Sequence, residues 1–201
     1  LVKGPNVMQG YLDDEDATAR CIDRNGWFHT GDLGEFRKDG LRIFGRLDGA
    51  FKLTTGEKVH PQRIEITLAN ESEFISTALI VGSGQDYVGV ILFPSQQNIS
   101  AWLKENNLPL DSQLSCVPAL RDLFARELER INAVIEVKYQ RPVRAIIADN
   151  QLSLERGELT PSGKVVRLTV MGLYEDQIHD MFATNPSERV IRIAKHQMQG
   201  T

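Results

Sequence analysis

The sequence contains few of the residues that build metal centres or disulfide frameworks. It has two cysteines and four histidines in 201 residues, and neither a CxxC nor an HExxH pattern. A zinc site or a disulfide scaffold is therefore not expected, and we predict no metal site in this chain. With so little cysteine, a reducing, cytoplasmic location is the default expectation.

Two further absences concern positive charge and long apolar runs. Lys and Arg total 23 against 27 Asp and Glu, a formal net charge of −4, so no basic face for a nucleic-acid partner is expected. The longest apolar stretches, such as residues 75–82 and 88–94, are too short for a transmembrane segment. Hydrophobic residues still make up 41% of the chain, which is enough for a core.

Hydrophobic periodicity and turn residues predict an α+β domain. Residues 1–32 resemble loops, and residues 183–201 are expected to form either an amphipathic turn or a disordered end. Between them the patterns predict hairpins at 33–45 (with Asp39-Gly40 as the turn) and 74–93 (turn at 82–86), strands at 50–53 and 143–148, and helices at 61–70, 95–106, 118–138 and 164–181. This order favours a small mixed or antiparallel sheet with helices packed over one face.

Three segments are unusual for a purely structural domain. The first is GWFHTGDLG at residues 26–34, where two glycines flank Thr30 and Asp32 just before a predicted strand. An aspartate at a rigid strand start is suited to accept hydrogen bonds from two hydroxyls, such as those of a ribose. Taken alone, Asp32 is better explained as the cap of a glycine-rich turn.

The second segment is GRLDGAFKLTTGEKVHPQRIE at residues 45–65, and the third is LTPSGKVVR at 159–167. In the second, Arg46, Asp48 and Lys52 fall within seven positions, which taken alone favours salt bridges on a solvated surface. In the third, Lys164 ends a Pro/Ser/Gly loop, from which a mobile lysine is able to enter a site. Taken alone, this segment favours an ordinary surface lysine.

Together and in this order, these segments resemble the late motifs of the adenylate-forming superfamily, which includes acyl-CoA synthetases, luciferases and the adenylation domains of peptide synthetases. The stretch GPNVMQGY at residues 4–11, followed by Ala17-Thr18, is similar to the segment that precedes them in that family. The details are more similar to long-chain and aryl acyl-CoA synthetases than to peptide synthetases. Val166 departs from the long-chain pattern, which usually has a second lysine there, so the substrate class stays open.

The resemblance implies a domain organisation. Residues 1–46 correspond to the end of a large N-terminal AMP-binding domain, a β-rich remnant, while 47–48 form a hinge and 49–201 a mobile C-terminal domain. The chain begins at Leu1 within a motif, so we expect a piece of a longer protein. The family's phosphate loop, its Mg²⁺-binding glutamate and its acyl pocket are expected in the N-terminal domain, which would be the chain's main partner.

The resemblance also assigns roles to single residues. Lys164 is the expected catalytic residue of adenylation, in which a carboxylic acid reacts with ATP. Asp32 would bind the ribose hydroxyls, and Arg46 the ribose or phosphate of the ATP or AMP. Asp48 corresponds to the hinge position, about which the C-terminal domain turns between two poses.

Two residues are expected to act when CoA accepts the acyl group. Lys52 and Gly56 lie on the loop that faces the site in the second pose, where a glycine allows the pantetheine arm to pass close to the backbone. A surface ion pair of Lys52 with Glu57 or Glu65 is nearly as well supported.

The sequence therefore predicts the C-terminal fragment of an acid–CoA ligase that activates a fatty or aryl acid, inactive on its own. One alternative is an adenylation domain that loads a carrier protein. The other is a non-catalytic interaction module with the same fold.

Overall fold

The computed structural model describes residues 1–46, 49–109 and 113–193, without the side chains of 33, 35, 42 and 44–46. The chain divides into two compact units, Leu1–Gly49 and Ala50–Thr201. We describe each unit by itself. The lysine of the third motif lies in the second unit, which we take first.

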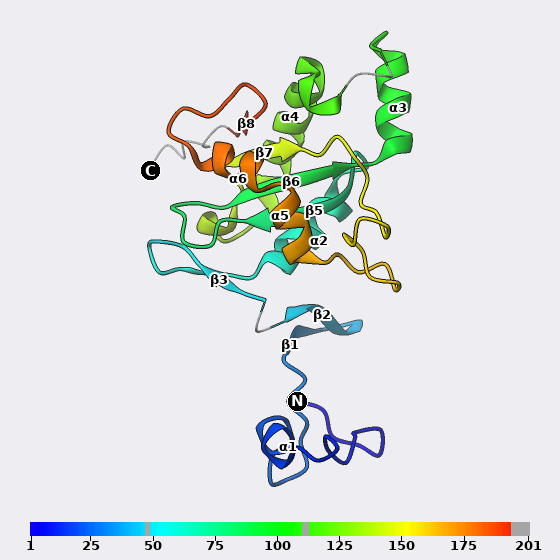
Figure 1. Cartoon of the computed structure of the whole chain (residues 1–201), viewed down its shortest axis with the longest axis vertical. Helices are drawn as coiled ribbons and strands as arrows, with labels where there is room; N and C mark the ends of the chain where they lie inside the picture. Colours follow the sequence, from blue (N-terminus) through cyan, green and yellow to red (C-terminus); the bar gives the residue numbers. More distant parts are fainter. Residues whose placement is uncertain (47–48, 110–112, 194–201) are drawn as a thin grey trace. The chain divides into compact units, whose positions relative to one another are not determined.

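A four-stranded sheet forms the centre of the second unit (Figure 1). Its order is β5 (Ile75–Val81), β6 (Gly89–Pro94), β7 (Arg144–Ile147) and β8 (Ile191–Arg192). The β5–β6 and β7–β8 pairs are antiparallel, whereas β6 and β7 are parallel. The predicted α+β class and mixed sheet are confirmed.

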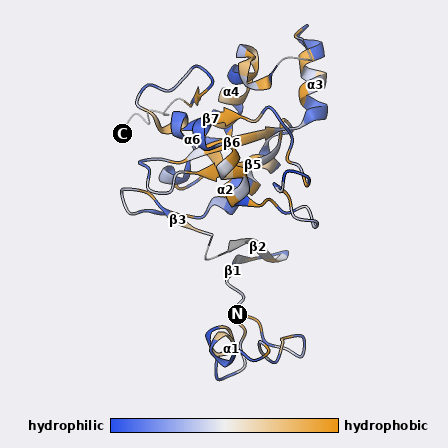
Figure 2. Ribbon diagram, in the orientation of Figure 1, coloured by the Kyte–Doolittle hydropathy of each residue, from blue (hydrophilic) through white to orange (hydrophobic). Residues whose placement is uncertain are grey.

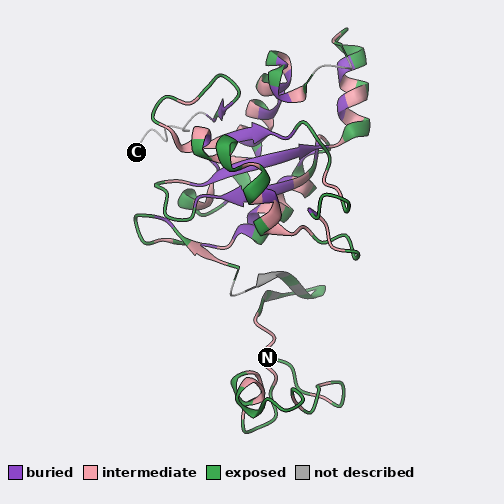
Figure 3. Cartoon of the chain, in the orientation of Figure 1, coloured by how far each residue is buried: buried purple, intermediate pink, exposed green. Residues whose placement is uncertain are grey.

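Helices cover both faces of this sheet. On one face lie α2 (Pro61–Glu71), α3 (Gln96–Glu105) and α4 (Pro118–Val134), and on the other lie α5 (Arg167–Leu173) and α6 (Glu175–Phe182). Neighbouring residues of β5 show the division, because Ile80 packs in the first core cluster and Leu79 in the second. The prediction of helices over one face was wrong. A strand buried on both faces is apolar at successive positions, as β5 and β6 are (Figures 2 and 3).

The predicted helices exist, but two of their boundaries differ. The helix expected at 118–138 ends at Val134, and a short 3-10 turn, Lys138–Gln140, follows it. The helix expected at 164–181 begins only at Arg167 and is interrupted at Tyr174, whose backbone (φ −109°, ψ 18°) is not helical. The Tyr174 ring packs edge-on against Phe93 of β6, so a tertiary contact accompanies the break.

The segment after Ala183 was expected to be a turn or a disordered end, but it contributes strand β8. Ile191 of β8 pairs with Ala145 of β7 and is only 4% exposed. Two residues of strand give no periodic signal in a sequence, so pairing with β7 and burial, rather than local propensity, determine this element.

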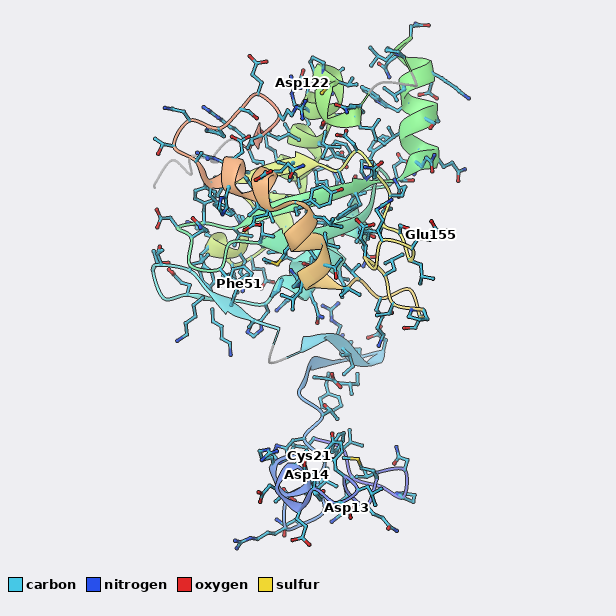
Figure 4. All side chains as sticks on the ribbon, viewed as in Figure 1. Asp13, Asp14, Cys21, Phe51, Asp122 and Glu155 are labelled. Carbon is cyan, nitrogen blue, oxygen red and sulfur yellow. The ribbon has the colours of Figure 1, made fainter. Side chains whose placement is uncertain are left out.

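The first unit contains α1 (Glu15–Cys21) and a hairpin of β1 (Asp32–Arg37) and β2 (Gly40–Arg46). The hairpin is as predicted, although its turn residues are 38–39, one position earlier than expected. The helix was missed. Its N-cap is Asp14, marked in Figure 4, whose side chain accepts the Ala17 N–H at 2.7 Å.

None of the residues in 1–46 whose burial is described is buried (Figure 3). Phe36 is 89% exposed and Leu12 is 92% exposed. Unlike the second unit, this unit has no core of its own among its described side chains.

The two core clusters predict how much stability is lost when a buried side chain is shortened. Leu128 of α4 is fully buried in the first core cluster, so Leu128→Ala should lower the free energy of unfolding of the 201-residue chain by about 2–5 kcal/mol. Leu168, which is 83% exposed, is the matched control, and Leu168→Ala should change the stability little. Urea denaturation measures both. Equal losses in the two variants would contradict the packing described here.

Candidate functional site

The segment at residues 159–165, here called the lysine turn, presents Lys164 on a tight hairpin. Its two end residues pair as an isolated antiparallel bridge. The Thr160 N–H donates to the Lys164 carbonyl at 2.8 Å, and the Gly163 N–H donates to the Thr160 carbonyl at 2.8 Å. The Lys164 N–H donates to Thr160 Oγ1 at 3.0 Å. Hydrogen bonds therefore hold the backbone on both sides of the lysine.

Local sequence explains this turn. Thr160, Pro161, Ser162 and Gly163 occupy its four positions, with proline second and glycine fourth, the placement that β-turns favour. Gly163 has a φ of +76°, where a side chain would be strained.

The Lys164 side chain is exposed. Within the described ranges, no acceptor lies within hydrogen-bonding or ion-pair distance of its ammonium group. The sequence predicts a mobile lysine at the end of a loop; the backbone that carries it is hydrogen-bonded, and its side chain is exposed. The hydrogen-bonded turn thus carries a long side chain whose ammonium group is unpaired within the described ranges.

A buried carboxylate organises the chain just before the lysine turn. Glu158 is 2% exposed, and its Oε2 accepts the Ser153 N–H at 2.8 Å and the Arg156 Nε–H at 2.9 Å. The Glu158 carbonyl accepts the Val166 N–H at 2.8 Å, beyond the far end of the turn. By contrast, Glu155 of the same loop is exposed and lies on its outer side (Figure 4). Sequence analysis missed Glu158, because no local pattern separates these two glutamates.

Just after the lysine turn, Arg167 begins α5 and binds the outer edge of the sheet. Its Nη1 donates to the Ile80 carbonyl at 2.7 Å, and its Nη2 donates to Glu65 Oε1. Glu65 Oε1 also accepts the Ile80 N–H at 2.7 Å. We call Glu65, Ile80 and Arg167 the edge clamp.

The edge clamp is largely shielded from water. The side chains of Glu65 and Arg167 are 15% and 30% exposed. Burial raises the pKa of Glu65, and the Arg167 guanidinium acts in the opposite direction. Each group thus depends on its partner for the interactions that water would otherwise supply.

A second candidate segment is the ribbon of β3 (Phe51–Lys52) and β4 (Lys58–Val59). Its loop closes through the Gly56 N–H, which donates to the Leu53 carbonyl at 3.0 Å. Gly56 has a φ of +91°, is exposed, and has no atom within 4 Å of where a Cβ would stand. The backbone is therefore open to close approach from outside.

The turn at residues 82–86 supports this ribbon. The Gly84 N–H donates to the Lys52 carbonyl at 2.9 Å, and the Thr54 N–H donates to the Gln85 carbonyl at 3.0 Å. The Thr54 hydroxyl donates to Asp86. The plain turn that the sequence predicts between β5 and β6 is thus also a support for the β3–β4 loop.

Lys52 is exposed and lies opposite Lys58 in the ribbon. Glu65 binds Arg167, and Glu57 accepts the Thr55 hydroxyl. Across the described ranges no ion pair of Lys52 is formed, so its interpretation as a partner of Glu57 or Glu65 was wrong.

The remaining predicted site residues, Asp32, Arg46 and Asp48, belong to the first unit. Asp32 is exposed, and its N–H donates to Thr30 Oγ1 at 3.1 Å. Asp32 and Arg46 are directly opposite in the β1–β2 register, at the open end of the hairpin. The fold therefore brings these two predicted residues together. Asp48 lies outside the described residues.

A pocket of about 250 Å³ lies beside α5 and α6, and no predicted site residue that the structure describes lines it. Most of its charged side chains already have partners. Asp149 accepts the N–H and the hydroxyl of Ser115 at 2.8 and 2.9 Å, and Arg156 pairs with Glu158 at 2.7 Å. These polar groups hold the loop rather than point to a ligand.

The described residues show two further absences. They contain no group of three or more His, Cys, Asp or Glu placed to hold a metal ion. Of the helices described, none is both long enough and apolar enough to cross a membrane.

Comparison with protein families identifies the second unit. Residues 48–186 match the family described as "AMP-binding enzyme C-terminal domain". The match includes the β3–β4 ribbon, the edge clamp and the lysine turn.

Among curated proteins, the chain is similar to fatty acid ligases. It is 30% identical over 187 residues to "Long-chain-fatty-acid–CoA ligase 1" of Cavia porcellus and equally to that of Homo sapiens. It is 29% identical over 194 residues to "Probable acyl-activating enzyme 16, chloroplastic" of Arabidopsis thaliana. These alignments cover 90–91% of this chain but only 26–27% of the relatives, so the chain spans about a quarter of their length.

Solved structures share the fold. The adenylation domain of carboxylic acid reductase from Segniliparus rugosus, in complex with AMP and a co-purified carboxylic acid, has a TM-score of 0.68 at 21% identity. That match covers 90% of this chain and 27% of that one. O-succinylbenzoate Coenzyme A Synthetase from Bacillus subtilis, in complex with AMP, has a TM-score of 0.53 at 24% identity and covers 83% and 28%.

The family match covers well over half of the chain, and the relatives and the fold agree with it. The superfamily to which the sequence motifs point is therefore confirmed. The chain belongs to the AMP-binding enzyme C-terminal domain family and corresponds to the C-terminal portion of adenylate-forming superfamily members.

Proposed function

We propose that this chain is the C-terminal part of a longer acid–CoA ligase, which activates a carboxylic acid with ATP and transfers the acyl group to CoA. The observation that carries the proposal is the exposed, unpaired Lys164 on a fixed turn, within a domain of the matching family. The curated relatives, named as long-chain fatty acid ligases, support it.

Residues 1–46 are, in this proposal, the end of a large N-terminal AMP-binding domain. Their lack of buried side chains among the described residues supports this, because a segment without its own core needs apolar surface from elsewhere. Residues 47–48 form the hinge, and 49–201 form the mobile C-terminal domain, so the N-terminal domain is the principal partner.

In the adenylation step, a carboxylate oxygen attacks the α-phosphorus of ATP. The new oxygen–phosphorus bond forms as the bond to the β-phosphate oxygen breaks, and pyrophosphate leaves with that electron pair. Negative charge accumulates around the α-phosphoryl group. The Lys164 ammonium stabilises this charge where it develops, and its fixed turn lowers the cost of placing it there.

Asp32 and Arg46 bind the nucleotide in this proposal. Asp32 accepts hydrogen bonds from the ribose hydroxyls, and Arg46 contacts the ribose or phosphate. Their positions opposite each other in the β1–β2 hairpin suit two contacts to one nucleotide. We assign Mg²⁺ to the N-terminal domain and give it no ligand here.

In the second step, the CoA sulfur attacks the acyl carbonyl carbon, the thiol proton is released, and AMP leaves with the electrons of the carbon–oxygen bond. The open surface over Gly56 lets the pantetheine arm pass along the backbone. Lys52, exposed on the same ribbon, assists there. Asp48 is the hinge that brings this ribbon, in place of the lysine turn, to the site.

The acid is a fatty or aryl acid, and the relatives named as long-chain fatty acid ligases favour the long-chain fatty class. Val166 departs from the usual long-chain motif. The acceptor is CoA, with a carrier protein as the alternative, since carboxylic acid reductase structures include an adenylation–carrier didomain of this fold. Turnover measured with CoA and with a carrier protein as the acyl acceptor distinguishes these two alternatives. The cytoplasmic location predicted from the low cysteine content belongs to this proposal as well.

The first prediction concerns Lys164. In the full-length enzyme, Lys164→Ala should lower carboxylate-dependent ATP–pyrophosphate exchange roughly 10²–10³-fold, because one charge-stabilising donor is lost. Thioester formation from supplied acyl-adenylate should be retained. A panel of fatty and aryl acids identifies the substrate class in the wild type.

Lys104→Ala is the control, since Lys104 is an exposed lysine on α3. Its exchange rate should equal that of the wild type. Equal loss of both half-reactions in Lys164→Ala would indicate a folding defect instead. No exchange with any acid, from a folded full-length protein, would favour a non-catalytic module.

The hinge generates a second prediction. Asp48→Pro should impair thioester formation more than adenylation, because proline fixes φ and blocks the rotation between poses. Asp48→Ala keeps rotational freedom and should retain both half-reactions. Single-turnover kinetics of each half-reaction provide the measurement. Normal second-step kinetics in Asp48→Pro would refute the hinge assignment.

The proposed domain division predicts weak nucleotide binding by the 201-residue chain alone. Half of the nucleotide site would lie in the N-terminal domain, so calorimetric titration with AMP should give a dissociation constant in the millimolar range or no binding. Micromolar binding would contradict the division.

A further inference from the structure

The outer edge of β5 is closed by side chains in place of a strand. β5 is the first strand of the sheet, so one of its edges has no strand partner. Edge strands expose N–H and C=O groups that need partners. At Ile80, Glu65 Oε1 accepts the N–H and Arg167 Nη1 donates to the C=O, each at 2.7 Å, while Arg167 Nη2 binds Glu65.

The edge clamp lies close to Lys164 along the chain. Only two residues separate Lys164 from Arg167. The intervening Val166 donates its N–H to the Glu158 carbonyl at 2.8 Å. The backbone from the lysine to Arg167 is therefore held by hydrogen bonds, and the contact of Arg167 with β5 lies just beyond the end of the lysine turn.

The clamp also joins α5 to the element that follows the β3–β4 ribbon. Glu65 lies on α2, which begins at Pro61, directly after β4. One ion pair thus connects α2, the sheet and the lysine turn, between residues 102 positions apart in sequence.

Apolar packing does not replace the clamp at the start of α5. Leu168, the next residue after Arg167, is 83% exposed, whereas Val170 is fully buried in the second core cluster. Val170 therefore attaches α5 to the sheet, but the polar contacts of Arg167 fix its first turn. Loss of the clamp should leave the helix docked and its beginning displaced.

We propose that Glu65 and Arg167 are positioning residues for Lys164. The edge clamp sets the position of the lysine turn relative to the sheet, and adenylation depends on that position. The inference rests on the proposed function of Lys164. Displacing a catalytic group by about 1 Å typically costs about 10²-fold in rate, so a shift of the turn has a measurable effect.

The test uses the full-length enzyme with Arg167→Ala, Arg167→Lys and Glu65→Gln. Arg167→Ala should lower the kcat of ATP–pyrophosphate exchange about 10- to 10²-fold at an unchanged KM for ATP. Thioester formation from supplied acyl-adenylate should be retained. Arg167→Lys keeps the charge without the fork that reaches two acceptors, and should recover part of the loss. Glu65→Gln keeps an acceptor for Ile80 and should lose less than Arg167→Ala.

Arg130→Ala is the matched control. Arg130 of α4 pairs with Glu71 of α2 at 3.8 Å and with Glu127 of its own helix at 3.0 Å, so its removal also breaks one ion pair to α2. Both half-reactions should be unchanged. Thermal unfolding of every variant separates positioning from stability, and if Arg167→Ala does not fold, the two conservative variants provide the test.

The outcomes separate this inference from the proposed function. If Arg167→Ala and Glu65→Gln leave exchange unchanged while Lys164→Ala abolishes it, the positioning role fails and the adenylation role of Lys164 stands. If the two half-reactions fall together with the unfolding temperature, the clamp is structural only. If even Lys164→Ala leaves exchange unchanged, the proposed function itself fails.

Discussion

At the outer edge of β5, Glu65 and Arg167 bind both polar backbone groups of Ile80 and each other, and the placement of the lysine turn follows from this arrangement. A sheet edge that is shielded from water must satisfy its backbone groups with partners. Here a helix on each face of the sheet supplies one side chain. The two helix layers are thus joined at the point where the backbone leaves Lys164.

The two candidate segments of the second unit share one design. In the lysine turn and in the β3–β4 loop, glycine at positive φ and short backbone hydrogen bonds fix the main chain. In each, an exposed lysine has no ion-pair partner in the described parts of the chain. A hydrogen-bonded loop that carries an unpaired lysine is suited to stabilise negative charge that develops on a substrate, because its backbone needs little further ordering when the substrate binds.

The two units differ in what stabilises them. The second unit buries two apolar clusters, one on each face of its sheet. In residues 1–46, by contrast, no residue whose burial is described is buried. A unit with a double core is able to move as a rigid body, and a unit without one depends on additional apolar surface. This contrast agrees with the proposed division into a mobile domain and the end of a larger one.

Local chemistry in the sequence was sufficient for the β1–β2 hairpin and the family, because turn residues and motifs act over a few positions. The separation of the last helix at Tyr174, strand β8 and the burial of Glu158 had no such signal. The pairing of Glu65 with Arg167 had no such signal either, and the sequence had instead suggested Glu65 as a partner of Lys52. These features depend on which residues meet across the sheet, and a carboxylate shows its partner only once the chain has folded around it.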